Sequence, residues 1–485
     1  MLFNSLQFLV FLPLVFVLYW FVFRRLKWQN AFVVVASYVF YGWWNWHFLL
    51  LIFITSLCSY ASGLLIDRAA AGSVRAKAVV AANLVINLGI LGLFKYYNFF
   101  AESFSCLLMA LGMHADLPTL RLILPVGISF YTFQALSYTI DVYRRRLPAT
   151  RDAVAFFAYI SFFPQLVAGP IERATQLLPQ MQRQRTFGYE AATDGMRQML
   201  CGFFKKMVVA DNCALVANDV WADCANQSSA ALAVGALMFT LQIYCDFSGY
   251  SDIAIGTARL FGINLSCNFD FPYFARNVSE FWRKWHISLM SWLTDYIYIP
   301  LGGNRVSRLK NVRNVGVVFL VSGLWHGANW TFVAWGVYHA MLFIPLRLMG
   351  VKGRFDQPVA AGKVLPNVKE LCQMLLTFTL VVVGWILFRS DSMAQAAAYM
   401  HGMVAPCSVG EALAALRMAK KPLAFGAVMM LAEWLQRTKQ HALQIDGNWC
   451  VLLRMRSVRW ALYVLIGAAT VWFQGAQQSF IYFQF

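Results

Sequence analysis

The 485-residue sequence is poor in charge: 13% of its residues are Asp, Glu, Lys or Arg, whereas 60% are hydrophobic. Soluble globular domains carry about 25% charged residues. This shortage excludes a disordered chain and argues against an ordinary soluble enzyme. A helix that crosses a bilayer needs about 20 apolar residues, and apolar runs of this order recur from 2–23 to 460–474. We therefore expect an all-α polytopic membrane protein with about 11–12 transmembrane helices plus re-entrant or interfacial helices.

Several chemical signatures are missing from the sequence. None of the ten cysteines stands in a C-x-x-C pair and no zinc-ligand spacing occurs, so we expect no metal site. The G-x-S-x-G elbow of serine hydrolases is absent, because the nearest string, at 247–251, reads FSGYS. Phosphate-binding loops are absent as well, which argues against an ATP-driven transporter. With no internal repeat and no long linker, we expect one membrane-embedded domain over residues 1–485.

Basic residues outnumber acidic ones, 40 against 22, for a net charge of +18. In a soluble protein this excess would suggest nucleic acid, but in a membrane protein it fits cytoplasmic loops and anionic lipid headgroups. We expect membrane lipids, and no nucleic acid, as partners. Basic clusters at 24–27 and 454–459 flank the first and last apolar runs. By the positive-inside rule, the N-terminus and the C-terminal tail should both be extracytoplasmic.

His326 is the most exceptional polar residue, because the run 315–335 holds no other ionisable side chain. An ionisable residue at membrane depth is a candidate for function, and imidazole is the usual general base near neutral pH. Gly323 and Gly327 would let a substrate or another backbone approach closely. The alternative is a buried histidine that holds two helices together.

Other buried polar residues leave two interpretations open. On a helix, Trp282 and His286 would share one face, which fits a binding wall as well as an ordinary interfacial helix. His339 follows His326 by 13 residues, nearly four helical turns, and we interpret it as structural. Carboxylates at 246 and 252 lie in an apolar stretch and need partners, which are either structural hydrogen bonds or substrate groups.

Six strings together resemble one protein family. They read LPVGISFYTF at 124–133, FPQLVAGPI at 163–171, DFSGYSD at 246–252, EFWRKWHISL at 280–289, YIPLGGN at 298–304 and GLWHGA at 323–328. The resemblance is to the membrane-bound O-acyltransferases, in the bacterial branch of alginate and peptidoglycan O-acetyltransferases, related to the teichoic-acid D-alanyl transferase. It covers roughly residues 1–390.

The resemblance implies a ring of helices around a central acyl-transfer tunnel, with a cytoplasmic chamber and an extracellular funnel. It places catalysis on His326 and gives His286 a second functional role. The donor would be a cytoplasmic thioester, expected to be acetyl-CoA, with no bound cofactor. His326 would take a proton from an acceptor hydroxyl, which then attacks the thioester carbonyl. For substrate binding we select Trp282, Arg283, Trp285, Asn304, Trp325, Asp246 and Ser251.

The chain ends in the aromatic string FIYFQF at 480–485, after a final helix that we expect near 460–474. The string resembles the C-terminal motif of the small accessory protein of the D-alanylation system, whose tyrosine is placed to receive the acyl group. We hypothesise that residues 460–485 form a final helix and a tail that folds back into the extracellular funnel. Tyr482 would then carry the acetyl group. An aromatic anchor at the membrane interface is the alternative.

The expected function is transfer of acetyl groups across the bacterial inner membrane to an extracytoplasmic polysaccharide, either peptidoglycan or alginate. The chain lacks an extracytoplasmic domain large enough to hold a glycan, and this, together with the family resemblance, implies a periplasmic esterase-type O-acetyltransferase as partner. A polysaccharide or lipid carrier without acyl chemistry is the alternative, and it would tolerate His326→Ala. Acylation of a lipid or protein is disfavoured by the bacterial-type strings.

Overall fold

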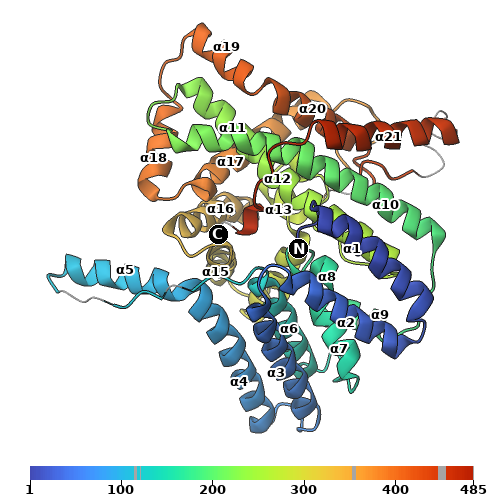
Figure 1. The fold of residues 1–485 in the computed structure, drawn as a ribbon. Helices are drawn as coiled ribbons and strands as arrows, with labels where there is room; N and C mark the ends of the chain where they lie inside the picture. The colour runs from blue at the N-terminus through green and yellow to red at the C-terminus, as the bar shows by residue number, and fades with distance from the viewer. Residues whose placement is uncertain (114–116, 121, 352–354, 356, 446–454, 484–485) are drawn as a thin grey trace. The chain divides into compact units, whose positions relative to one another are not determined.

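A computed structural model describes residues 1–113, 117–120, 122–351, 355, 357–445 and 455–483 (Figure 1). This part of the chain is helical and contains no β-strand, which confirms the all-α polytopic class. Five of its segments are long and apolar enough to cross a membrane: Trp46–Asp67, Val74–Ala110, Ser229–Leu260, Trp330–Leu348 and Val368–Arg389. The larger number of spans stays a prediction, and the last two residues of the aromatic string, at 484–485, lie outside the described residues.

Several apolar runs fold as interrupted helices rather than as single spans. The first run forms α1 (Leu6–Val17), which contains Pro13, and then the π-helical turn η1 (Leu18–Val22). In the run 195–220, α10 (Tyr189–Phe203) continues through the π-helical turn η4 (Phe204–Ala210) into α11 (Asp211–Ala222). Such π turns are rare and occur frequently at functional sites. The η4 turn contains both Lys205 and Lys206, and both are buried.

One compact unit comprises Met1–Ala192 and Thr257–Ser266. Helix α6 lies in its interior, since 14 of its 16 residues are buried and it packs against α3, α4 and α7. Besides α1 and η1, the helices of this unit are α2 (Leu26–Gly42), η2 (Trp46–Phe48), α3 (Leu49–Asp67), α4 (Val74–Leu91), η3 (Gly92–Tyr96), α5 (Tyr97–Ala110), α6 (Ile128–Tyr143), α7 (Ala153–Ser161), α8 (Phe163–Leu166) and α9 (Ala174–Met181).

The second compact unit comprises Thr193–Gly256 and the described residues from Cys267 onward. Its further helices are α12 (Ser229–Leu260), η5 (Pro272–Phe274), α13 (Val278–Lys284), α14 (Ile287–Leu293), η6 (Thr294–Tyr298), α15 (Arg308–His326), α16 (Trp330–Leu348), α17 (Val368–Arg389), α18 (Met393–Gly402), α19 (Val409–Met418), α20 (Lys420–Leu435), α21 (Arg456–Trp472) and η8 (Ile481–Phe483). The prediction of one domain over the whole chain concerns both units and stays a prediction.

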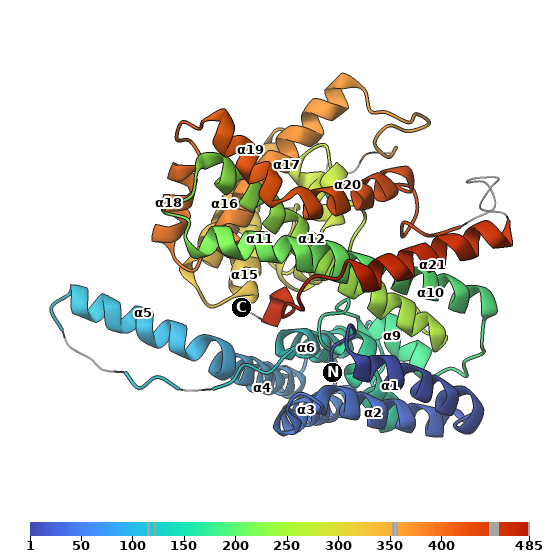
Figure 2. The same cartoon turned by 45° about the horizontal axis from the view of Figure 1, so that its top comes forward.

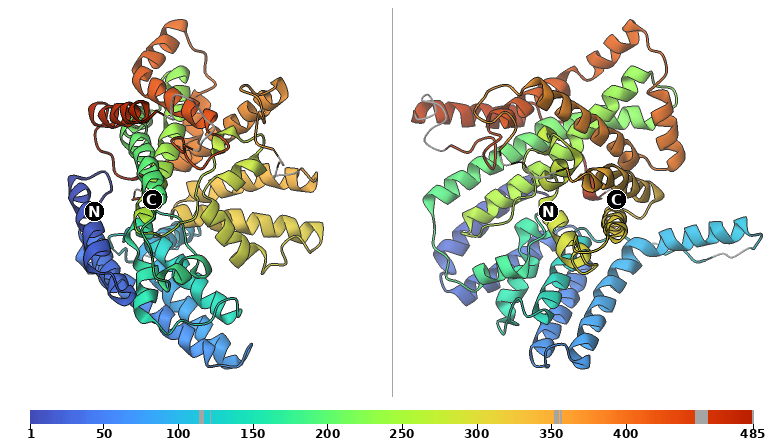
Figure 3. Two further views of the ribbon diagram at one scale, coloured as in Figure 1. Left: turned by 90° about the vertical axis from the view of Figure 1, so that its right-hand side faces the viewer. Right: turned by 180° about the vertical axis from the view of Figure 1, so that it is seen from behind.

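Helices α15 and α16 form a closely packed antiparallel pair within the second unit (Figure 3). Glycines make the contact possible: a Cβ atom on Gly323 would lie 2.3 Å from the Phe332 carbonyl oxygen, and one on Gly336 would lie 2.5 Å from the Phe319 carbonyl oxygen. The two backbones therefore touch where a side chain would keep them apart. Gly323 thus admits another backbone, which was one of the two expectations for it.

The chain after α21 turns back toward the interior of the second unit (Figure 2). Gly475 N–H donates to the Met207 carbonyl oxygen at 2.9 Å, and Asn212 Nδ2 donates to the Phe473 carbonyl oxygen at 2.9 Å. Residues 473–483, which we call the tail, therefore run along η4 and α11 and end in the short helix η8. The tail thus folds back within this unit, and our hypothesis that it enters an extracellular funnel stays a prediction.

Candidate functional site

The rings of His286, His326 and Tyr482 meet in the interior of the second unit. The centre of the Tyr482 ring lies 5.6 Å from that of His326 and 6.4 Å from that of His286. Trp325 contacts all three rings, since its centre is 4.9 Å from His326, 5.5 Å from His286 and 6.0 Å from Tyr482. Three residues that we predicted to be catalytic, and one that we predicted to bind substrate, are thus brought together from three distant parts of the sequence.

The position of His326 follows from the point at which a helix ends. It is the last residue of α15, and Gly327 continues in an extended conformation. Asn329 then caps α16, because its side chain accepts a hydrogen bond from the Thr331 N–H at 3.0 Å. The imidazole is 3% exposed and is walled by rings of Trp335 and Phe388, whose centres are 5.1 and 5.2 Å away. An imidazole at such a break can act as a general base in a site that excludes water.

His286 lies in a break between two short helices, so our expectation that it shares a helix face with Trp282 is wrong. Helix α13 ends at Lys284, and His286 has a φ of +45°, in the left-handed region that non-glycine residues rarely adopt. Asn268 holds the break in place: its carbonyl oxygen accepts from the Ile287 N–H at 3.0 Å, and its Oδ1 accepts from the Ser288 hydroxyl at 2.6 Å. Burial lowers the pKa of His286 to about 3, so its imidazole is neutral at physiological pH.

Tyr482 is held by its ring and by the residue before it. Its ring centre lies 4.6 Å from that of Phe247 on α12, and the Ile481 N–H donates to Asp246 Oδ2 at 2.8 Å. Burial raises the pKa of the Tyr482 hydroxyl well above its usual range. The hydroxyl therefore keeps its proton at neutral pH, and it becomes a nucleophile only where a base takes that proton.

The two carboxylates of the string 246–252 have lysine partners. Lys206 Nζ lies 2.8 Å from Asp246 Oδ1, and Lys205 Nζ lies 3.0 Å from Asp252 Oδ2. All four side chains are buried, and ions at such depth are stable only when they are paired. The partners that the sequence required are therefore residues of this chain, as one of our two interpretations had it.

The remaining predicted substrate-binding residues lie in different surroundings. Trp285 and Trp282 are buried against other tryptophans, with ring centres 4.8 Å from Trp385 and 5.5 Å from Trp335, respectively. Ser251 Oγ accepts from Asn268 Nδ2 at 3.1 Å, so it supports the residue that holds the His286 break. Asn304 is exposed in the turn between η6 and α15, whereas Arg283 is exposed at the end of α13 and lines a cavity.

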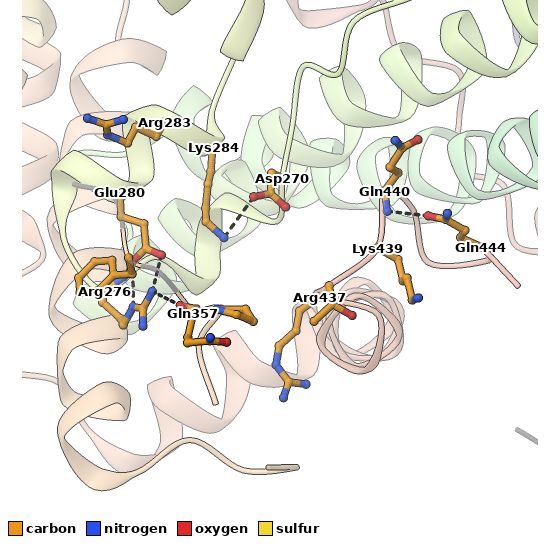
Figure 4. A pocket seen from close by; sticks show the side chains of 13 residues that line it. Asp270, Arg276, Glu280, Arg283, Lys284, Gln357, Arg437, Lys439, Gln440 and Gln444 are labelled. Carbon is orange, nitrogen blue, oxygen red and sulfur yellow. Dashed lines mark hydrogen bonds and ion pairs between the residues drawn. The ribbon is translucent and has the colours of Figure 1, made fainter. Parts of the chain in front are cut away.

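That cavity has a volume of about 880 Å³ and is polar (Figure 4). Basic side chains outnumber carboxylates around it by five to two: they are Arg276, Arg283, Lys284, Arg437 and Lys439, against Asp270 and Glu280. Arg276 pairs with Glu280 at 2.9 Å, and Lys284 pairs with Asp270 at 3.4 Å. An excess of guanidinium and ammonium groups suits a ligand that carries phosphates. Our sequence reasoning selected only Arg283 here; it passed over Lys284, the next residue of the same string, and Arg276, Arg437 and Lys439 lie outside the strings that we singled out.

Comparison with known proteins identifies the family. Residues 39–377 match the membrane-bound O-acyltransferase family. The chain belongs to the membrane-bound O-acyltransferase family. It is therefore an enzyme of the acyltransferase class and a multi-pass membrane protein. The matched region of this acyltransferase contains both histidines of the site and α13 to α16, and it ends before the tail.

The names of curated relatives of this acyltransferase refer to alginate, peptidoglycan and teichoic acid. A probable alginate O-acetylase AlgI of Pseudomonas aeruginosa is 41% identical over 394 residues, which are 81% of this chain and 73% of the relative. A peptidoglycan O-acetyltransferase of Helicobacter pylori is 33% identical over 434 residues, covering 83% of this chain and 80% of the relative. A teichoic acid D-alanyltransferase of Bacillus subtilis is 27% identical over 294 residues, covering 56% and 70%.

Proposed function

We propose that this acyltransferase moves acetyl groups from a cytoplasmic thioester to an extracytoplasmic polysaccharide, alginate or peptidoglycan, and that Tyr482 carries each acetyl group on the way. The contact of the Tyr482 ring with the rings of His286 and His326 is the observation that carries the proposal. A tyrosine whose ring lies beside a candidate base can itself supply the acceptor hydroxyl. The names of the alginate and peptidoglycan relatives support both the acetyl group and the class of acceptor.

The proposed first step is transfer of the acetyl group to Tyr482. The His326 imidazole takes the phenolic proton as the Tyr482 oxygen attacks the thioester carbonyl carbon. The C–S bond then breaks, and the thiolate leaves as a thiol after it takes the proton from the imidazolium. The acetyl group is now an ester on Tyr482. The apolar rings around the base exclude water, which protects the ester from hydrolysis.

In the second step, a hydroxyl of the acceptor or of a partner enzyme attacks the Tyr482 ester. The new C–O bond replaces the bond to the phenolic oxygen, and Tyr482 regains a proton from the attacking hydroxyl. His286 is neutral and touches the same ring, so it is placed to orient the tyrosine or the acyl group. The tail is thereby ready for another donor.

We propose acetyl-CoA as the donor and the cavity beside α13 as the site of its phosphate groups. The net positive charge around a polar space of about 880 Å³, with Arg283 exposed among its lining residues, suits the several phosphates of coenzyme A. We further propose that the protein lies in the bacterial inner membrane with its tail on the extracytoplasmic side. Its proposed partner is a periplasmic esterase-type O-acetyltransferase. The support for the orientation is the position of the basic clusters at 24–27 and 454–459.

The test uses purified protein in detergent with radiolabelled acetyl-CoA, and compares wild type with His326→Ala and Tyr482→Phe. Label that stays covalently on the wild type, and on neither variant, supports a histidine-dependent relay through the tail. Release of CoA by Tyr482→Phe at the wild-type rate refutes the relay but leaves His326 as the base. If no turnover occurs even with a periplasmic partner and a glycan added, although the protein is folded, the carrier function becomes the better account.

A further inference from the structure

The buried ion cluster around Lys206 also contacts the tail. Lys206 Nζ lies 2.8 Å from Asp246 Oδ1 and 2.9 Å from Asp211 Oδ1, and all three side chains are buried. The second oxygen of Asp246 accepts from the Ile481 N–H at 2.8 Å, while Lys206 Nζ donates to the Gln478 carbonyl oxygen at 3.3 Å. The cluster thus supplies one charged acceptor and one charged donor to the tail backbone, and charge-assisted hydrogen bonds are the strong ones.

Residues next to the cluster hold the earlier part of the tail. The Met207 carbonyl oxygen accepts from the Gly475 N–H at 2.9 Å, and Asn212 Nδ2 donates to the Phe473 carbonyl oxygen at 2.9 Å. All four of these tail partners, from 473 to 481, are backbone atoms. The surface formed by η4 and the start of α11 therefore fixes the path of the tail as well as its end.

Lys205, the residue before Lys206, shows that a buried ion pair does not by itself bind the tail. Lys205 Nζ is 3.0 Å from Asp252 Oδ2 and 2.7 Å from Glu433 Oε1, and the Glu433 carboxylate also accepts from the Tyr244 hydroxyl at 2.9 Å. The partners in this second cluster lie on α12 and α20, Gln198 Nε2 on α10 donates to Asp252 Oδ1 at 2.9 Å, and in the part of the chain that the structure describes no bond joins the cluster to residues 473–483. Within the described residues, consecutive lysines of one π-helical turn thus serve two different clusters.

We propose that Lys206, Asp211 and Asp246 form a tail seat, a positioning cluster that sets the register of the tail so that Tyr482 stands against the two histidines. Two consecutive residues of α12 define the register of the tail. Asp246 accepts from the Ile481 N–H, and Phe247 contacts the ring of Tyr482, which follows Ile481 in the tail. A slip by one residue would bring Ile481 or Phe483 to the histidines, and neither has a hydroxyl. The link from the seat to catalysis rests on the proposed role of Tyr482.

The seat is tested by hydrogen–deuterium exchange, read by mass spectrometry, on full-length protein in detergent. Asp246→Asn keeps the shape of the side chain but removes its charge, and we expect the peptide containing 475–483 to exchange about tenfold faster. Asp252→Asn is the matched control, because it also removes a buried lysine partner but lies in the other cluster. Its tail should exchange at the wild-type rate. Equal tail exchange in Asp246→Asn and wild type would overturn the proposal.

A second pair of variants leaves the buried ions untouched. Ile481→Pro removes the N–H that Asp246 accepts, whereas Ile481→Val keeps it, so only the proline variant should loosen the tail. Acetyl transfer provides the other readout: kcat should fall in Asp246→Asn and Ile481→Pro, while the KM for acetyl-CoA stays the same. A loosened tail with unchanged kcat refutes the positioning role. Lost transfer with an unchanged tail refutes the seat but leaves the relay through Tyr482 standing.

Discussion

Substitution of Gly323 by alanine tests whether the contact between α15 and α16 sets the position of His326. The added Cβ would lie 2.3 Å from the Phe332 carbonyl oxygen, which is a backbone atom of α16 and cannot rotate away. Real Cβ contacts essentially never fall below 3.0 Å, so the two helices must separate locally by at least about 0.7 Å. Overpacking of this kind costs about 1–3 kcal/mol, and alanine regains about 0.5–1 kcal/mol over glycine inside a helix. We expect the free energy of unfolding to fall by about 0.5–2 kcal/mol.

The effect on activity should be larger than the effect on stability. His326 ends the same helix three residues later, so a shift of α15 moves the imidazole relative to Trp335, Phe388 and Tyr482. Misplacement of a catalytic group by about 1 Å can cost about 100-fold in rate. We expect the rate of CoA release from acetyl-CoA to fall by about 10- to 100-fold. Thermal unfolding measured on the same sample shows how much of the loss comes from unfolded protein.

Gly316→Ala is the matched control for this experiment. Gly316 lies on α15 as well, but a Cβ there would meet no atom within 4 Å. It should therefore leave the rate unchanged and stabilise the helix slightly, by about 0.5–1 kcal/mol at most. If Gly323→Ala were as active and as stable as Gly316→Ala, the close approach of the two backbones would have no bearing on the catalytic histidine.

Three further predictions concern the tail, the basic cavity and pH. Gly475→Ala should speed removal of the tail by carboxypeptidase, because its Cβ would lie 2.7 Å from the backbone carbonyl carbon of Asp211; Gly467→Ala, whose Cβ meets nothing within 4 Å, should not, and equal rates in both variants would refute the close fit. Arg283→Gln removes an exposed cation from the cavity and should raise the KM for acetyl-CoA roughly three- to tenfold at low salt, with kcat unchanged, whereas Arg308→Gln, outside the cavity, should have no effect. An unchanged KM would argue against donor binding in the cavity. Burial lowers the pKa of His286 from 6.5 to about 3, so below pH 6.5 the unfolded chain binds a proton that the folded chain does not. Stability should therefore decline by up to about 1.4 kcal/mol per pH unit between pH 6.5 and 3, and His286→Gln should reduce this slope in thermal unfolding at a series of pH values; an identical slope would show that other groups set it.

Part of the site was predictable because some of its residues differ clearly in type from the residues around them in the sequence. His326 stands out as the only ionisable residue of a long apolar run, and Tyr482 stands in an aromatic string at the end of the chain. Both signals are visible without any knowledge of the fold. The need of the carboxylates at 246 and 252 for partners was predictable in the same way, because an unpaired ion at that depth is unstable.

The rest depends on contacts between distant segments. The break at His286 is held by Asn268, 18 residues earlier, and a helix through Trp282 and His286 was the reasonable local expectation. The lysine partners of Asp246 and Asp252 interrupt the apolar run 195–220, but nothing in the sequence of this run shows which lysine faces which carboxylate. The basic cavity likewise joins α13 to residues 437–444, and no motif connects the two.

The way in which the tail is held has a consequence for its evolution. The tail is bound through the carbonyl oxygens of Phe473 and Gln478, which every residue type can supply. It is also bound through the N–H groups of Gly475 and Ile481, which every residue type except proline can supply. Natural selection should therefore conserve the spacing more than the residue types between 474 and 479, apart from Gln478, whose side-chain Oε1 accepts from Asn218 Nδ2 at 3.4 Å, and the glycine at 475. Related chains should show tails that diverge freely in sequence yet keep a constant count of residues from that glycine to the tyrosine. A single inserted or deleted residue in this stretch should be far more damaging than several substitutions.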